Sequence, residues 1–248
     1  MNVARLLFAL LLALPAMAQQ PTVATEISFE RIARASKEYL RDSAELPLHM
    51  TVDFSATNST GRVLKHRKGE FDYDFHGFNP RSNNAKMNLS PSSNPGLKEA
   101  RSTAFVATLP SLLVVSDVEH EGKMKVIDSP RPDIFAVEFV PEQKCEPLEW
   151  MRAAYLFKSL CTGRVRVQLQ RDDLSIKAFA FDAGGLPVRA KVDYLGEASI
   201  TGFHVDIDFQ KATLPGDPKP FVVPWHVTVT VVTDKGKLVM AGEFALKK

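Results

Sequence analysis

The sequence predicts an α+β fold: a strongly curved antiparallel sheet of about ten strands, an incomplete β-barrel, with helices covering its concave face. Three observations lead to this prediction. Many segments alternate apolar and polar residues with a period of two, which is typical of antiparallel strands with one packed and one solvated face. Other segments have the apolar spacing of helices. Polar stretches at residues 79–96 and 214–220 are rich in Pro, Asn, Asp and Ser and are expected to be loops.

The alternating segments predict the strands. The clearest alternation places apolar residues at every second position in five segments: Leu48 to Phe54, Phe71 to Phe75, Val165 to Leu169, Phe203 to Phe209 and Trp225 to Val231. Further strands are expected at residues 123–128, 134–140, 174–181, 185–194 and 237–246. The last of these follows the turn sequence Asp234-Lys235-Gly236.

Helical spacing predicts the cover of the sheet. We expect one helix over residues 25–40, where Thr25 is a suitable N-cap and Phe29 and Ile32 share one stripe. A second helical segment spans residues 98–115 and is interrupted by Pro110. A third helix is expected before Cys161. A sheet with one apolar face must bury that face, so these helices are the expected cover.

Composition limits the class of protein. The chain has 248 residues, of which 45% are hydrophobic and 24% are charged, and these values exclude disordered, collagenous, coiled-coil and multi-pass membrane proteins. The 31 basic and 29 acidic residues nearly cancel, leaving a formal net charge of +2. So small a net charge argues against nucleic acid as a partner.

The N-terminus has the order of a secretory signal peptide. Arg5 precedes an apolar run at residues 6–14, which is followed by small residues and a predicted cleavage site after Ala18. A membrane-spanning helix needs about 20 apolar residues, so no permanent anchor is expected. No Cys follows the cleavage site, which excludes the lipid attachment of a lipoprotein. We therefore expect a signal peptide at residues 1–18, one domain at 19–248 and a periplasmic location.

Cys145 and Cys161 are the only cysteines, and an exported protein resides where disulfides persist. The residues between them have helical spacing, and a continuous helix would hold its ends about 20 Å apart, beyond the roughly 6 Å that a disulfide allows. The disulfide therefore requires the helix to end early and the chain to fold back. We expect a disulfide between Cys145 and Cys161; the alternatives are two buried thiols or a pair that bonds only after rearrangement.

Two segments carry a resemblance to a known family. Residues 60–75, TGRVLKHRKGEFDYDF, predict a polar hairpin that leads into a Gly-Glu-Phe strand, and residues 203–246 predict a Pro-containing approach, a strand, a turn and a final strand. With the preceding helix and signal peptide, this order resembles the superfamily of periplasmic lipoprotein carriers and outer-membrane lipoprotein-sorting proteins. The resemblance implies an incomplete barrel whose hydrophobic cavity receives acyl chains. Its ligand would be a lipid, an acylated protein or another apolar molecule.

Aromatic residues in the alternating segments are the candidate lining of that cavity. They are Phe54, Phe71, Tyr73, Phe75, Phe135, Phe139, Phe203 and Phe209. The same side chains would equally fill a closed core, because core packing is the usual role of alternating aromatic residues. The protein would then be a non-enzymatic envelope protein that acts through contacts with a protein partner. The sequence leaves both alternatives open.

The sequence carries no catalytic signature. It has no Gly-x-Ser-x-Gly elbow, no His-Glu-x-x-His helix and no Gly-rich phosphate loop, so we expect neither an enzyme nor a cofactor. Carboxylates and imidazoles share a strand face in two groups: Asp72, Asp74 and His76, and His204, Asp206 and Asp208. The two groups would form a metal or acid/base site only if their strands were neighbours. The alternative is a solvated sheet face.

Basic residues cluster at residues 62–68, in a predicted hairpin. They would either contact anionic lipid head groups or an acidic partner at the rim of the cavity, or simply protect an exposed edge.

Overall fold

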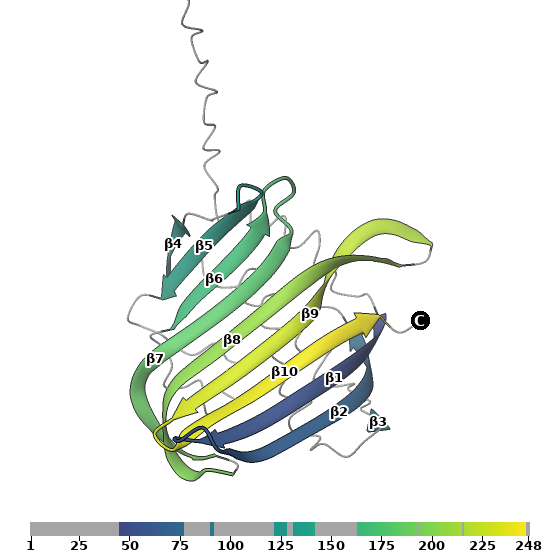
Figure 1. The fold of residues 1–248 in the computed structure, drawn as a ribbon. Coiled ribbons are helices and arrows are strands. Elements are labelled where there is room, and N and C mark those ends of the chain that lie inside the picture. Colours follow the sequence, from purple (N-terminus) through teal and green to yellow (C-terminus); the bar gives the residue numbers. More distant parts are fainter. Residues whose placement is uncertain are drawn as a thin grey trace, which may run out of the picture.

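The computed structural model describes residues 45–76, 90–91, 122–127, 131–141, 163–192, 194–214 and 216–246. All regular structure in these ranges is strand (Figure 1). The strands are β1 (Glu45–Asn58), β2 (Val63–His76), β3 (Ser90–Pro91), β4 (Gly122–Ile127), β5 (Ile134–Pro141), β6 (Arg164–Gln170), β7 (Ile176–Val192), β8 (Gly196–Leu214), β9 (Asp217–Thr233) and β10 (Gly236–Leu246). They form one antiparallel sheet in the order β3-β2-β1-β10-β9-β8-β7-β6-β5-β4.

The prediction of an α+β fold with an incomplete barrel is wrong for this part of the chain. The described ranges contain strands and no helix, and the sheet is open, with β3 and β4 at its two edges. Within the same ranges there is no helix of the length and hydropathy needed to cross a membrane. The expected helices at residues 25–40, at 98–115 and before Cys161 lie outside the described residues, as do the signal segment 1–18 and both cysteines.

The predicted strands are largely confirmed. All five segments with clear alternation lie in strands, and the turn at residues 234–235 joins β9 to β10. Two predicted strands, at residues 174–181 and 185–194, instead form the single long strand β7. Strand β9 begins at Asp217, inside the predicted loop at 214–220.

The pairing register places the apolar residues on one face. Val229 of β9 lies opposite Met240 of β10 and Val205 of β8, and Val205 lies opposite Phe181 of β7. Directly opposed residues share a face, so the apolar face runs continuously from β1 to β6. Buried side chains on this face are Leu48, Met50, Val52, Phe54, Val167, Leu169, Phe179, Val205, Ile207, Val227 and Val229. The intervening positions, such as Thr51, Asp53 and Thr228, form the polar face.

The hairpin of β7 and β8 bends over the apolar face. Gly184 lies opposite Gly202 and Val188 opposite Ile200, so residues 185–187 of β7 face the single residue 201 of β8. Such a bulge bends the strands that contain it. Beyond the bend, the ring centroid of Tyr194 lies 5.7 Å from that of Phe54 on β1.

The contact between Tyr194 and Phe54 requires this bend. Strands β10, β9 and β8 separate β1 from β7, and in a flat sheet β1 and β8 would lie about 14 Å apart. Figure 1 shows the lower ends of β7 and β8 curling behind the ends of β9, β10 and β1. The sequence predicted helices as the cover of the apolar face. At this end, a bent hairpin covers it.

Candidate functional site

The predicted cavity residues occupy equivalent positions of several strands. Phe54 lies on β1, Phe71, Tyr73 and Phe75 on β2, Phe135 and Phe139 on β5, and Phe203 and Phe209 on β8. The register assigns all of these positions to the apolar face, because Phe71 opposes Met50 and Phe139 opposes Val165. Of the side chains that the structure describes, those of Phe54, Phe203 and Phe209 are buried and that of Phe135 is half-buried.

The sheet separates these aromatic residues into groups. The ring of Phe203 contacts that of Phe181 on the neighbouring strand, with centroids 6.2 Å apart. Strands β2 and β5 lie toward opposite edges of the sheet, so their aromatic positions do not adjoin one another. These aromatic residues therefore do not form one cluster. They lie on the broad apolar face of the sheet, which we call the apolar floor.

Tyr194 lies at one end of this floor and was not predicted from the sequence. Lys65 and Arg67 occupy apolar-face positions of β2, opposite Ala56 and Phe54. The Nζ of Lys65 lies 5.8 Å and the Cζ of Arg67 5.7 Å from the centroid of the Tyr194 ring, within the range of cation–π attraction. Tyr194 therefore packs on an aromatic residue and faces two cations. We call these four residues, Phe54, Lys65, Arg67 and Tyr194, the tyrosine site.

The backbone at Tyr194 adopts a conformation that favours glycine. Its φ is 66°, and the amide of Leu195 closes the turn by donating to the carbonyl of Val192 at 3.1 Å. A non-glycine residue in the left-handed region costs about 1 kcal/mol. The contacts of the Tyr194 ring offset this backbone cost. A large aromatic residue in a tight turn, two residues before Gly196, was therefore the sequence signal for the site.

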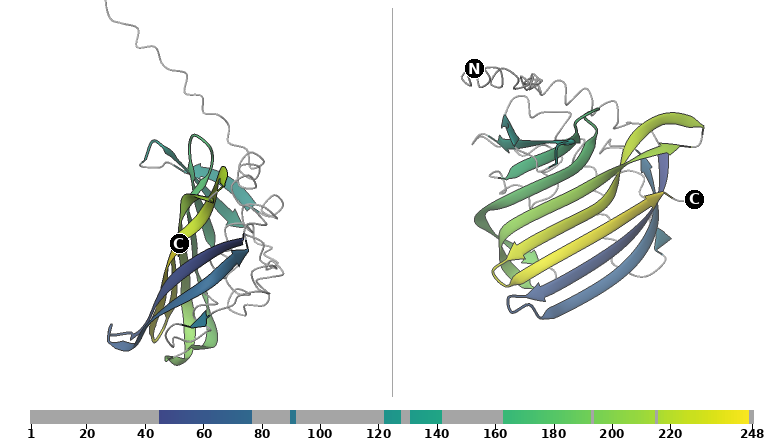
Figure 2. Two further views of the ribbon diagram at one scale, coloured as in Figure 1. Left: turned by 90° about the vertical axis from the view of Figure 1, so that its right-hand side faces the viewer. Right: turned by 45° about the horizontal axis from the view of Figure 1, so that its top comes forward.

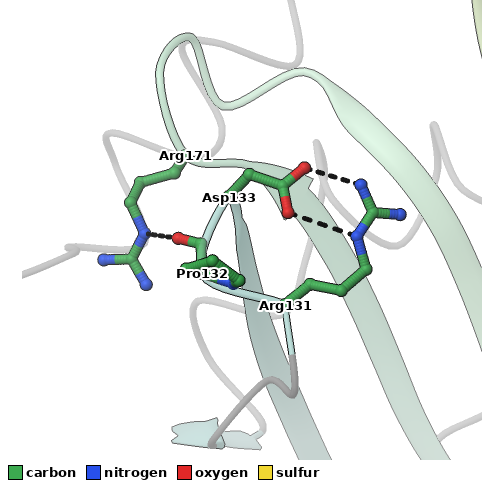
Figure 3. Close-up of polar contacts among 4 residues, drawn as sticks. All are labelled: Arg131, Pro132, Asp133 and Arg171. Atoms are coloured by element: carbon green, nitrogen blue, oxygen red, sulfur yellow. Dashed lines mark hydrogen bonds and ion pairs between the residues drawn. The ribbon is translucent and has the colours of Figure 1, made fainter.

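A second corner of the sheet is held by charged side chains (Figure 3). The guanidinium of Arg131 donates two hydrogen bonds to Asp133, at 2.6 and 3.2 Å, and these lower the pKa of the Asp133 carboxyl. Arg171 donates from Nε to the carbonyl of Pro132 at 2.7 Å, and its Cζ lies 3.9 Å from the ring centroid of Phe135. The β6–β7 turn is thereby joined to the segment that enters β5.

Asp173 extends this corner to β8. Partial burial raises the pKa of its carboxyl, but hydrogen bonds from Lys211 and from the backbone amide of Ser175 outweigh that effect and lower the pKa to about 2. Leu174, beside it, has a φ of 58° and is buried. We call the contacts among residues 131–133, 171–175 and Lys211 the charged corner.

The polar face provides no metal site in the described residues. The group at Asp72, Asp74 and His76 lies on β2, and the group at His204, Asp206 and Asp208 lies on β8, with β1, β10 and β9 between them. The two groups are therefore not neighbours, and no cluster of three or more His, Cys, Asp or Glu residues suited to a metal ion occurs among the residues described. The hypothesis of a shared site is wrong.

The group of His204, Asp206 and Asp208 on β8 makes one ion pair and contains one carboxyl group with a raised pKa. His204 lies 3.1 Å from Asp182. Burial, and then the negative charge of Asp208, raise the pKa of Asp206. The arrangement is that of a solvated, charged sheet surface.

Alternation divides the basic cluster at residues 62–68 between the two faces. His66 and Lys68 lie on the polar face, where they approach Asp53 at 2.9 and 3.3 Å. Lys65 and Arg67 lie on the apolar face and belong to the tyrosine site. The two interpretations of the cluster, edge protection and a cavity rim, stay predictions.

Trp225 corrects the expected alternation in β9. The sequence pattern groups it with Val227, Val229 and Val231 on the apolar face, but its side chain is 39% exposed. The register shifts here, because Asp208 opposes His226 whereas Phe209 opposes Pro224, which leaves Trp225 as the extra residue of a bulge. Pro224 was the available signal, since proline within a strand often marks a bulge.

The sequence matches no protein-family profile and no curated protein. Among solved structures, the chain is similar to the crystal structure of a LolA superfamily protein from Nitrosomonas europaea, with 6% sequence identity, a TM-score of 0.38, and coverage of 90% of this chain and 94% of that chain. The function proposed below rests on the geometry of the sheet.

Proposed function

We propose that the apolar face of the sheet binds an apolar ligand, either a lipid or the acyl group of an acylated protein. The observation that carries this proposal is the continuous apolar face from β1 to β6 on a single open sheet, bent so that its own hairpin reaches over one end. Sites for apolar ligands are concave and mostly apolar, with a few polar groups that fix orientation. Lys65 and Arg67 are such groups at the rim.

The tyrosine site is the proposed entrance. The tip of the β7–β8 hairpin is held over Phe54 by one tilted ring contact and by two cation contacts to Tyr194. Contacts of these kinds contribute about 0.5–1 kcal/mol each when exposed. The tip can therefore separate from β1 at a modest cost in free energy. Its separation uncovers the apolar floor beside Phe54.

The proposal includes the setting in which such binding is useful. The protein is a non-enzymatic carrier that reaches the periplasm by means of the segment at residues 1–18. It requires no cofactor and no nucleic acid. Its partner is the apolar ligand itself or the protein that bears the acyl group.

A second candidate function has an observation in its favour. Phe54, Phe203 and Phe209 are buried in the structure, which is what a filled core requires. The protein would then be an envelope protein that acts through contacts with a protein partner. The two candidates differ in whether an apolar molecule reaches the face.

Methyl NMR spectroscopy distinguishes the two candidate functions by comparing valine residues on the two faces of the sheet. Val205, Val227 and Val229 report on the apolar face, whereas Val232 and Val239 lie on the polar face of β9 and β10 and serve as matched controls. Added palmitate is expected to shift the first set of methyl signals and leave the second set unchanged. Unchanged signals in both sets would support the filled core. Equal shifts in both sets would indicate non-specific adsorption and also contradict the proposal.

A further inference from the structure

Three turns gather at one end of the sheet. Asn58 at the end of β1 lies opposite Gly236 at the start of β10, so the β1–β2 and β9–β10 turns adjoin. Asp234 donates its amide to the carbonyl of Ser199 at 3.0 Å and accepts the amide of Ser199 at 2.8 Å, which ties the β9–β10 turn to β8. The β7–β8 turn reaches the same end through Tyr194. We call this surface the three-turn end; Figure 2 shows the β1–β2 turn projecting at its margin.

Exposed apolar side chains concentrate here. Val63 is 58%, Leu64 42% and Tyr194 41% exposed. Leu64 is the extra residue of a bulge, since Ala56 opposes Lys65 and Thr57 opposes Val63. Single exposed apolar residues are common, but a group of them on projecting turns is typical of a surface that contacts another phase or molecule.

Cations surround these side chains. They are Arg62, Lys65, Arg67, Lys235 and Lys237, each exposed or half-buried. The carboxylate of Asp234 already accepts the hydrogen bond from Ser199, and Glu197 lies opposite Lys191 on the hairpin. Positive charge therefore exceeds negative charge around the apolar group, although the whole chain is nearly neutral.

We propose that the three-turn end docks on a membrane surface that contains anionic lipid. Lys and Arg near such a surface attract its negative potential, Tyr is suited to the level of the head groups, and two projecting aliphatic side chains can enter between them. An acidic protein partner is the weaker match, because a stable protein interface covers about 800 Å² on each partner and the apolar group here occupies narrow turns. The docking goes beyond ligand binding and does not depend on it.

Vesicle sedimentation tests the proposal with the exported protein, whose N-terminus is first checked by mass spectrometry. The probes are vesicles of phosphatidylcholine with and without phosphatidylglycerol. Arg62→Gln combined with Lys65→Gln removes charge, and Leu64→Ser removes an apolar contact. Matched controls are Lys125→Gln and Val126→Ser on the edge strand β4, where Lys125 is exposed and Val126 is 51% exposed. Thermal unfolding verifies that each variant is folded.

We expect binding to the anionic vesicles only, and weaker binding at higher salt. Each removed charge is expected to lower partitioning about fivefold, and Leu64→Ser to lower it about threefold or more, with both controls unchanged. Equal binding to neutral vesicles, no binding to either, or equal losses in the controls would overturn the proposal. If the protein bound soluble polyglutamate but not the vesicles, the proposal would be overturned in favour of an acidic protein partner.

Discussion

The charged corner and the three-turn end are held together by different forces. At the charged corner, Arg131 and Lys211 each contact a carboxylate, and a hydrogen bond from Arg171 joins the two segments. At the three-turn end, the contacts are close backbone packing, backbone hydrogen bonds, the hydrogen bond from the amide of Ser199 to the Asp234 carboxylate, and the ring of Tyr194. The cations at the charged corner are used within the fold. Those at the tyrosine site, Lys65 and Arg67, lie near the ring of Tyr194.

This difference assigns structural and functional roles to the two regions. A corner built from ion pairs fixes the path of β5, β6 and β7 and depends on pH. The three-turn end is built mainly from backbone packing, and its cations add only the two contacts with the ring of Tyr194. Substitutions at Gly236, Asp173 and Tyr194 test the distinction, and Asp206 on the polar face of β8 provides a comparison outside both regions.

The largest effect is expected for Gly236→Ala at the three-turn end. Gly236 has a φ of 150°, and a Cβ there would meet the backbone oxygen of Thr57 and lie 2.8 Å from the Cα of Asn58. Backbone atoms cannot yield as a flexible side chain does, so we expect a loss of about 3 kcal/mol in the free energy of unfolding, measured with urea. Gly216→Ala is the control, since its φ is 84° but its Cβ would meet nothing within 4 Å, and it should cost only about 1 kcal/mol. Equal costs would show that the turns are not closely packed.

Asp173→Asn should weaken the charged corner at neutral pH. The pKa of Asp173 is lowered to about 2, so its ionised form stabilises the fold above the pKa of the unfolded chain, and this stability is lost as the pH falls toward 2. After allowance for solvent screening, we expect a loss of about 1–2 kcal/mol at pH 7. The difference between variant and parent should shrink between about pH 5 and pH 2. The exposed neighbour Asp172→Asn is the control; a loss that is independent of pH would contradict the ion-pair account.

Two substitutions of Tyr194 distinguish the stability that its ring contacts provide from the cost of its backbone strain. Tyr194→Ala keeps the unfavourable φ of 66° and loses the contact with Phe54, so it should lower stability by about 1–2 kcal/mol. Tyr194→Gly also loses the ring but removes the strain, and it should be about 1 kcal/mol more stable than the Ala variant. Thermal unfolding compares the two. An Ala variant as stable as the Gly variant would show that the turn has no strain for the ring to offset.

Asp206→Asn should have the smallest effect and the opposite sign. Burial and the charge of Asp208 raise the pKa of Asp206, so the folded state disfavours its ionised form and the penalty is present at pH values above that pKa. We expect the Asn variant to be more stable by a few tenths of a kcal/mol at pH 7, and equal to the parent below the ordinary pKa of 3.8, where both states are protonated. Urea midpoints at the two pH values measure this; a less stable variant at pH 7 would indicate that the charge has a partner.

Local sequence patterns predicted the strands but not how they bend. The alternation at Leu48 to Phe54 and at Phe203 to Phe209 identified both the strand and its buried face, because a period of two is a property of the chain itself. The bulges at residues 184–188 and at Trp225 depend on which residues lie opposite them, and that register is not written in either strand alone. The sequence pattern therefore predicted two strands in place of β7, and it placed Trp225 on the apolar face.

The candidate site was predicted in part for the same reason. The apolar floor follows from the alternation of apolar and polar residues, and the basic cluster at residues 62–68 was recognised. The combination of Phe54, Lys65, Arg67 and Tyr194 was not predicted, since it joins β1 and β2 to a turn that lies about 130 residues further along the chain. Only the bend of the β7–β8 hairpin brings them together.

The central claim is that the apolar face binds an apolar ligand, and native mass spectrometry tests it most directly. The exported protein is purified without detergent and measured before and after delipidation. The account predicts a co-purifying species of discrete acyl-chain mass that delipidation removes and that added palmitate replaces. A clean ligand-free mass before delipidation, together with no uptake of palmitate afterwards, would contradict it.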